Sequence, residues 1–143
     1  MLNKWDERFL TLAKHVAGWS KDDSTQVGCV IVDANNRIVS LGFNGPPRAV
    51  NDEYRDRDQK IRRTIHAEKN ALAFANRDVS GCTAYVTHPT CSQCAAFLIQ
   101  HGISKVIFNE GSEDFLSRWG DDYREAIEMY TEALIPVIVV SEP

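Results

Sequence analysis

The sequence predicts one α/β domain, a three-layer α-β-α sandwich built on a mixed five-stranded sheet. Three observations support this fold class: the chain has 143 residues, it contains five short β-branched or apolar runs, and helical apolar patterns separate most of them. No linker, repeat or shift in composition divides the chain, so we expect residues 1–143 to form a single domain.

The first third of the chain predicts a helix followed by a β-hairpin. Apolar side chains recur at helical spacing over residues 5–19, and the polar run 20–24 ends that pattern. Two β-branched runs, 27–32 and 37–43, flank a short polar turn and are typical of antiparallel strands.

The middle of the chain predicts an exposed segment and then a helix and a strand. The sequence Gly45-Pro46-Pro47 ends the second strand, and residues 48–63 are too rich in charge to fill a core, so we expect a loop or insertion there. Helical spacing resumes over 64–75, and residues 83–87 read as a short strand.

The last third alternates helices with strands. The chain continues with a helix over 90–101, a strand over 105–109, a long apolar helical face over 115–134 and a strand over 137–140. We expect Gly120 to interrupt the long helix. Helices long enough to cross over predict parallel pairing of the last strands.

The charge and composition exclude several classes of protein. The net charge of -4 and the pI of about 5.5 argue against binding to polymeric nucleic acid through its phosphates. No apolar run is long enough to span a membrane and no targeting pattern stands at Met1 to Asp6, so we expect a cytoplasmic protein without a membrane partner. Two of the four cysteines form a C-x-x-C motif, which in that compartment indicates metal or redox chemistry.

The strongest chemical signal combines His66 and Glu68 with Cys91 and Cys94. One imidazole and two thiolates are typical zinc ligands, and both motifs fall where helices are expected to begin, which favours the thiolate. Three protein ligands leave a fourth position for a water, whose pKa zinc lowers to about 7, and Glu68 can move its protons. The alternative is a structural zinc module, closed by a fourth ligand such as Cys82 or His88.

The presence of Glu68 favours catalysis over that alternative, because H-x-E followed by C-x-x-C is the zinc deaminase signature. The chain resembles the cytidine and deoxycytidylate deaminase superfamily over nearly its whole length. The segments most similar to its deoxycytidylate branch are Ser20–Asp22, Val27–Gly28, Gly42–Gly45, His66–Ala71 and Tyr85–Thr87.

The resemblance implies a cytidine deaminase-like fold and hydrolysis of dCMP to dUMP, a thymidylate precursor, and ammonia. It implies one zinc per chain, held by the three ligands above. It also implies that Asn44 bonds the sugar hydroxyl, that Val27 lines the base pocket and that the Ala67 amide holds the pyrimidine carbonyl. Lys21 is our candidate for contacting the substrate phosphate, although scattered surface charge is the commoner explanation of such a residue.

The resemblance further implies a homo-oligomer, commonly a hexamer. Its activator would be dCTP and its inhibitor dTTP, each with Mg²⁺, at a site near Phe43, Gly45 and Arg48. The chain departs from the family pattern at Ala49, where a glycine is usual, and at Thr90, where a proline usually precedes the first cysteine. We expect the Thr90 hydroxyl to cap the following helix instead.

Other residues have simpler explanations. We expect His15, His88 and His101 to be ordinary histidines, and Cys29 and Cys82 to be small core residues. Trp119, Tyr123 and Tyr130 share a helical spacing that predicts a core or subunit contact. A tRNA adenosine deaminase has the same metal motifs, but it should show a basic surface, which the acidic balance argues against.

Overall fold

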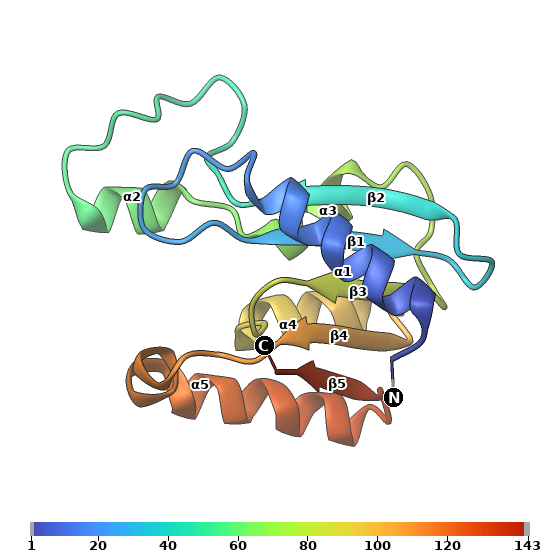
Figure 1. The fold of residues 1–143 in the computed structure, drawn as a ribbon. Helices are drawn as coiled ribbons and strands as arrows, with labels where there is room; N and C mark the ends of the chain where they lie inside the picture. The colour runs from blue at the N-terminus through green and yellow to red at the C-terminus, as the bar shows by residue number, and fades with distance from the viewer. Residues whose placement is uncertain (1, 142–143) are drawn as a thin grey trace.

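The computed structural model describes residues 2–141 and contains a five-stranded sheet with helices on both faces (Figure 1). The helices are α1 (Lys4–Ala17), α2 (Arg57–Arg63), α3 (Ala67–Phe74), α4 (Ser92–Gln100) and α5 (Glu113–Glu132). The strands are β1 (Gly28–Val32), β2 (Ile38–Phe43), β3 (Thr83–Val86), β4 (Lys105–Asn109) and β5 (Val137–Val140). Their order is β2-β1-β3-β4-β5, with β1 antiparallel to β2 and β3 and the last two pairs parallel, so the predicted mixed sheet is confirmed.

The two faces of the sheet are covered unequally. On one face α1 packs its apolar side against alternate residues of the central strands, where Phe9 and Leu10 meet Val30, Tyr85 and Ile107. The opposite face is covered by α3, α4 and α5, which together bury the larger of the two apolar clusters (Figure 1). No helix among the described residues is long and apolar enough to cross a membrane.

Glycines let two helices approach the sheet at backbone distance. A Cβ at Gly42 in β2 would lie 2.4 Å from both the Ala67 carbonyl oxygen and the Ala71 amide nitrogen of α3. A Cβ at Gly28 in β1 would lie 2.0 Å from the Ala13 carbonyl oxygen of α1, on the other face. Since real Cβ atoms do not come so close, only glycine fits at either position.

Some expected helix boundaries differ from the structure. The helix expected from Thr64 begins at Ala67 and the one expected from Thr90 begins at Ser92, because the preceding residues, His66 and Cys91, have extended backbone. The predicted cap is also wrong: the side chain at the start of α4 that accepts an amide hydrogen bond is that of Cys91, from Cys94.

Three further corrections concern the charged segment and the long helix. Residues 57–63 of the expected loop form α2, whose cap Asp56 accepts a hydrogen bond from the Gln59 amide. Gly120 does not interrupt α5, since tertiary packing offsets the low helix propensity of one glycine. Leu134 lies beyond the end of α5 with φ +59° and is 88% exposed, so it is not part of the apolar face.

Candidate metal centre and active site

The three expected metal ligands converge between the starts of α3 and α4. His66 is the residue before α3, Cys91 the residue before α4, and Cys94 lies in the first turn of α4. His66 Nδ1 lies 3.4 Å from Cys91 Sγ and 3.3 Å from Cys94 Sγ, and all three ligand atoms lie within 4.8 Å of one another. Residues far apart in the sequence therefore form one S₂N donor set.

The donor set fits zinc in distance and in protonation. Zinc bonds of about 2.3 Å to sulfur and about 2.0 Å to nitrogen, at a tetrahedral angle, separate the two ligand atoms by about 3.5 Å, close to the observed spacing. A hydrogen bond from the Cys94 side chain lowers the pKa of the Cys91 thiol to about 4, opposed by burial and assisted by His66. A thiolate is the form that binds the metal.

A closed structural site would need a fourth protein ligand, and the group found within residues 2–141 contains only three. His88 has its Nδ1 3.0 Å from the Pro89 carbonyl oxygen, and its ring packs edge-on against Phe115. Cys82 is buried next to β3 as a small core residue, and so is Cys29 within β1. The arrangement therefore leaves a coordination position for water, as in catalytic zinc sites.

Glu68 is buried beside this cluster, in the first turn of α3. Burial raises its pKa to about 7, against the attraction of His66, which lowers it. A carboxyl with a pKa near 7 can accept and donate a proton at neutral pH, which is the property required of a general acid and base. The structure thus places the predicted proton carrier next to the predicted ligands.

Asn44 and Val27 lie together at the end of β2. The Asn44 side-chain oxygen accepts a hydrogen bond from the Val27 amide at 2.8 Å, and its side-chain amide donates to the Thr25 carbonyl at 2.8 Å. The Asn44 backbone amide also donates to the Val27 carbonyl. These bonds fix the orientation of the buried Asn44 amide before any ligand arrives.

The loop that carries Asn44 is attached to the start of α3. Gly45 and Ile65 exchange two backbone hydrogen bonds, which brings the loop next to His66. Asn70 donates a hydrogen bond of 2.7 Å to the Phe43 carbonyl. The Ala67 amide is the first of α3, so it has no acceptor within the helix and is available to a bound molecule.

The expected effector residues occupy the outer part of the same loop. Phe43 packs edge-on against Trp19, with ring centroids 6.2 Å apart, and the Arg48 guanidinium lies 5.8 Å from the centre of the Phe74 ring. Ala49 has φ +67°, the left-handed conformation that glycine favours. The backbone there keeps a glycine-like shape although the residue is alanine.

Lys21 lies in a surface hollow beside α2 and not within the metal cluster. Its side chain is exposed, and its ammonium group is 3.8 Å from an Asp52 carboxylate oxygen. The same hollow contains Lys60, which is already paired with Asp22 and Asp23. A role for Lys21 toward phosphate stays a prediction.

A comparison with known proteins identifies the family. Residues 3–110 match the model of the cytidine and deoxycytidylate deaminase zinc-binding region. The chain belongs to this deaminase family. It is 50% identical over 139 residues to an uncharacterized deaminase from the luxG 3′ region of Aliivibrio fischeri, covering 96% of this chain and 94% of that protein.

More distant members of the deaminase family agree with this assignment. The human deoxycytidylate deaminase is 40% identical over 114 residues, which are 73% of this chain and 64% of the human protein. The dCMP deaminase of cyanophage S-TIM5, in complex with dCMP and dUMP, has the same fold with a TM-score of 0.80 at 23% identity, covering 98% of this chain and 99% of that one. The resemblance inferred from the sequence is thereby confirmed.

Sequence reasoning missed two partners of the cysteine loop of this deaminase. The Thr90 hydroxyl pairs with the Tyr130 hydroxyl of α5 at 2.7 Å, so it does not cap α4 as expected. The Asp122 carboxylate of α5 accepts hydrogen bonds from the Ser92 amide and hydroxyl, at 2.9 and 2.6 Å. Neither contact has a local signal, because the partners are 30 and 40 residues apart in the sequence.

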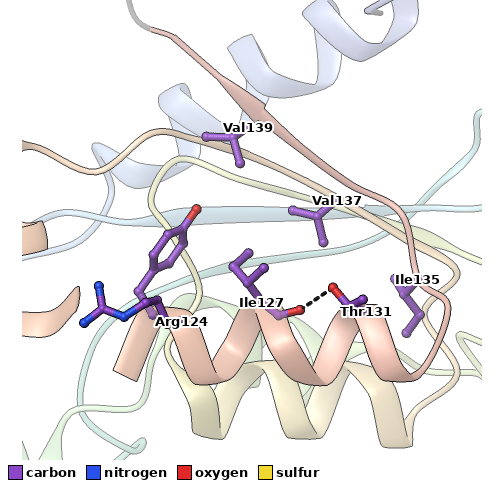
Figure 2. Close-up of a pocket in the computed structure, with 7 residues that line it drawn as sticks. Arg124, Ile127, Thr131, Ile135, Val137 and Val139 are labelled. Carbon is purple, nitrogen blue, oxygen red and sulfur yellow. Dashed lines mark hydrogen bonds between the residues drawn. The ribbon is translucent and has the colours of Figure 1, made fainter. Parts of the chain in front are cut away.

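An apolar groove lies between α5 and β5, away from the metal cluster (Figure 2). Its lining residues are Tyr123, Arg124, Ile127, Thr131, Ile135, Val137 and Val139. Figure 2 shows the Thr131 hydroxyl bonded to the Ile127 carbonyl of the same helix, at 2.9 Å. The groove has no metal ligand or buried carboxylate and contributes nothing to the chemistry of the site.

Proposed function

We propose that this deaminase converts dCMP and water to dUMP and ammonia with one zinc ion per chain. The observation that carries the proposal is the convergence of His66, Cys91 and Cys94 beside the buried carboxyl of Glu68. The choice of dCMP is supported by the relatives named deoxycytidylate deaminase in mouse and human. The phage enzyme that shares this fold is named as a dCMP deaminase in complex with dCMP and dUMP.

The three ligands would hold zinc through one imidazole nitrogen and two thiolates. When bound there, zinc supplies a Lewis acid that lowers the pKa of a water to about 7. The residues of the chain supply the remaining chemistry, which is proton transfer and orientation of the base.

Glu68 moves the protons in the proposed reaction. It takes one proton from the attacking water as the water oxygen bonds to C4 of the cytosine and delivers this proton to N3. It then takes the second proton from the hydroxyl formed at C4 and delivers it to the amino nitrogen. The C4–N4 bond then breaks, ammonia leaves and a carbonyl forms at C4. Its pKa of about 7, raised by burial, suits both directions of transfer.

Residues around the cluster would bind and orient the nucleotide. The free amide of Ala67 would donate to the pyrimidine carbonyl, Val27 would line the base pocket, and the fixed side chain of Asn44 would reach the sugar hydroxyl. Lys21 is the proposed partner of the phosphate, and its exposure leaves its ammonium group accessible. These roles are the substrate part of the proposal.

Regulation and assembly complete the proposal. The deaminase would be a homohexamer in the cytoplasm, activated by dCTP and inhibited by dTTP with Mg²⁺ at Phe43, Gly45 and Arg48. The left-handed backbone of Ala49 supports a retained loop shape, and the exposed apolar side chains Phe74, Phe97 and Trp119 support an assembly. All four cysteines within residues 2–141 are free, which suits a reducing compartment.

The test combines one variant with a panel of substrates. Ammonia release is followed with cytidine, deoxycytidine, dCMP, dCTP and a tRNA anticodon stem, with and without Mg²⁺ and each triphosphate. The Glu68→Gln variant should keep its zinc and lose turnover by more than about a hundredfold. If that variant still released ammonia at the normal rate, or if dCMP reacted no faster than deoxycytidine, the proposed reaction would be wrong.

A further inference from the structure

Helix α5 holds the ligand Cys91 through both of its neighbours in the sequence. On one side the Thr90 hydroxyl lies 2.7 Å from the Tyr130 hydroxyl. On the other side both oxygens of Asp122 accept hydrogen bonds from Ser92, one from its amide and one from its hydroxyl. The residue that offers the thiolate is therefore held between two contacts from one helix.

Each contact satisfies groups that would otherwise lack a partner. Thr90 and Tyr130 are almost fully buried, where a hydrogen bond is strong and an unpaired hydroxyl is costly. Ser92 is the first residue of α4, so its amide has no acceptor within the helix. A carboxylate at that position also interacts favourably with the positive end of the helix dipole.

The backbone of Cys91 itself is held by the Ala95 amide, which donates to the Cys91 carbonyl at 2.9 Å. Cys91 precedes α4 with extended backbone, φ -73° and ψ 168°, and is only half-buried. Thr90 stands where the family pattern has a proline, so the loop lacks the restriction that a proline ring places on φ. The contacts from α5 supply a restraint of another kind at the same point.

We propose that Asp122 and Tyr130 are positioning residues of the metal site, which keep the Cys91 thiolate within reach of Cys94 and His66. Both lie beyond residues 3–110, the part that matches the zinc-binding region of the family. The helix that follows this region is therefore part of the metal site. This inference rests on the proposed zinc site.

The experiment measures metal binding and not activity. Zinc affinity is determined by competition with a chromophoric chelator for the wild type, Asp122→Ala, Asp122→Asn and the control Asp121→Ala. Asp121 is the adjacent residue of α5, exposed and paired with Arg124 on the same helix. The absorption spectrum of each protein loaded with Co²⁺ reports the geometry of the thiolate ligands, and thermal unfolding reports whether the fold is kept.

Asp122→Ala should weaken zinc binding by about tenfold or more and change the Co²⁺ spectrum, as expected for loss of an outer-shell restraint. Asp122→Asn should stay within about threefold of the wild type, because its amide can accept from the Ser92 amide and donate to the Ser92 hydroxyl. Asp121→Ala should match the wild type. Equal affinities for Asp122→Ala and the wild type, or equal losses in the alanine and asparagine variants, would overturn the inference.

A second variant keeps the test valid if Asp122→Ala does not fold. Tyr130→Phe removes one hydroxyl and should weaken zinc binding several-fold, whereas the control Thr131→Val, at a hydroxyl bonded only within α5, should not. An unchanged affinity in Tyr130→Phe would remove this residue from the site. If the wild type itself failed to bind zinc, the proposed function would fall as well, which separates the two failures.

Discussion

The hydroxyl groups of Thr90 and Tyr130 form a hydrogen bond of 2.7 Å in the interior, between the loop before α4 and the face of α5. Tyr130→Phe or Thr90→Val should each lower the free energy of unfolding by about 1–3 kcal/mol, because the remaining hydroxyl is left buried and unpaired. The double variant should lose less than the sum of the two. Urea denaturation at neutral pH measures all three, and strictly additive losses would contradict the pairing.

The close approach of β2 and α3 predicts a strong effect of one methyl group. In Gly42→Ala the new Cβ would meet the backbone of Ala67 and Ala71, so α3 must move or strain. The free energy of unfolding should fall by about 1–3 kcal/mol or more, and zinc affinity should fall with it, because His66 directly precedes α3. The matched control is Gly45→Ala, whose Cβ would meet nothing within 4 Å. Equal stabilities of the two variants would contradict this packing.

The end of α5 offers a stabilising substitution. Leu134 has φ +59° and follows a hydrogen-bond pattern in which its amide bonds to Thr131 and the Ile135 amide bonds to Tyr130. Glycine is the residue best suited to this position, and removal of the exposed leucine side chain costs little packing energy. Leu134→Gly should therefore raise the melting temperature, with a gain of about 1 kcal/mol.

The control for this substitution is Ala133→Gly, one residue earlier, where the backbone is right-handed. At that position glycine relieves no strain and only increases the backbone entropy lost on folding, so the variant should be destabilised by about 0.5–1 kcal/mol. Opposite signs at two adjacent residues are the expected result. A loss at both positions would mean that the leucine side chain makes a contact that outweighs the strain of its backbone.

The ion pairs of Lys60 predict a pH-dependent contribution to stability. Its ammonium nitrogen lies 3.0 Å from Asp22 and 2.8 Å from Asp23. Burial opposes the shift, but hydrogen bonds from the Thr25 amide and Lys60 lower the pKa of Asp22 below its ordinary value. The stabilisation from Asp22 is therefore present above about pH 4 and is lost as the pH falls through the lowered pKa.

Lys60→Met should accordingly destabilise the protein by about 1 kcal/mol or less at pH 7, because the pair is partly exposed to solvent. The difference from the wild type should shrink below about pH 4, where the carboxyls take up protons. Lys21→Met, which removes an exposed ammonium group 3.8 Å from Asp52, serves as the control and should have almost no effect. Unfolding measured at several pH values decides between these outcomes, and a pH-independent loss would contradict the prediction.

The three side chains that converge in the cluster and the positions of the strands along the chain could be predicted from the sequence, because both show local patterns. His66, Cys91 and Cys94 were identifiable from residue type and spacing, and the strands from short β-branched runs. The short helix α2 had a local signal too, since Asp56 and Gln59 stand three apart like a capping pair. The high charge of residues 48–63 nevertheless led to the prediction of a loop.

Long-range contacts account for what the sequence did not predict. Nothing near Thr90 shows that its hydroxyl pairs with a tyrosine 40 residues later, so a local cap was the natural expectation. The same holds for Asp122, which looks like any surface carboxylate of an amphipathic helix until α4 is placed beside it. The uninterrupted helix at Gly120 likewise depends on the packing of α5 and not on its own propensities.

Backbone atoms alone determine the spacing between Gly42 and α3. The placement of the helix that carries Glu68 is therefore independent of the side chains that would contact a substrate. Side chains of the surrounding loops can change in size and polarity without tilting the helix that carries Glu68. The position of Glu68 can therefore be kept while the side chains of the neighbouring loops change. Such a scaffold is well suited to the evolution of new base or nucleotide preferences. The substitutions that change these preferences would accumulate outside this contact.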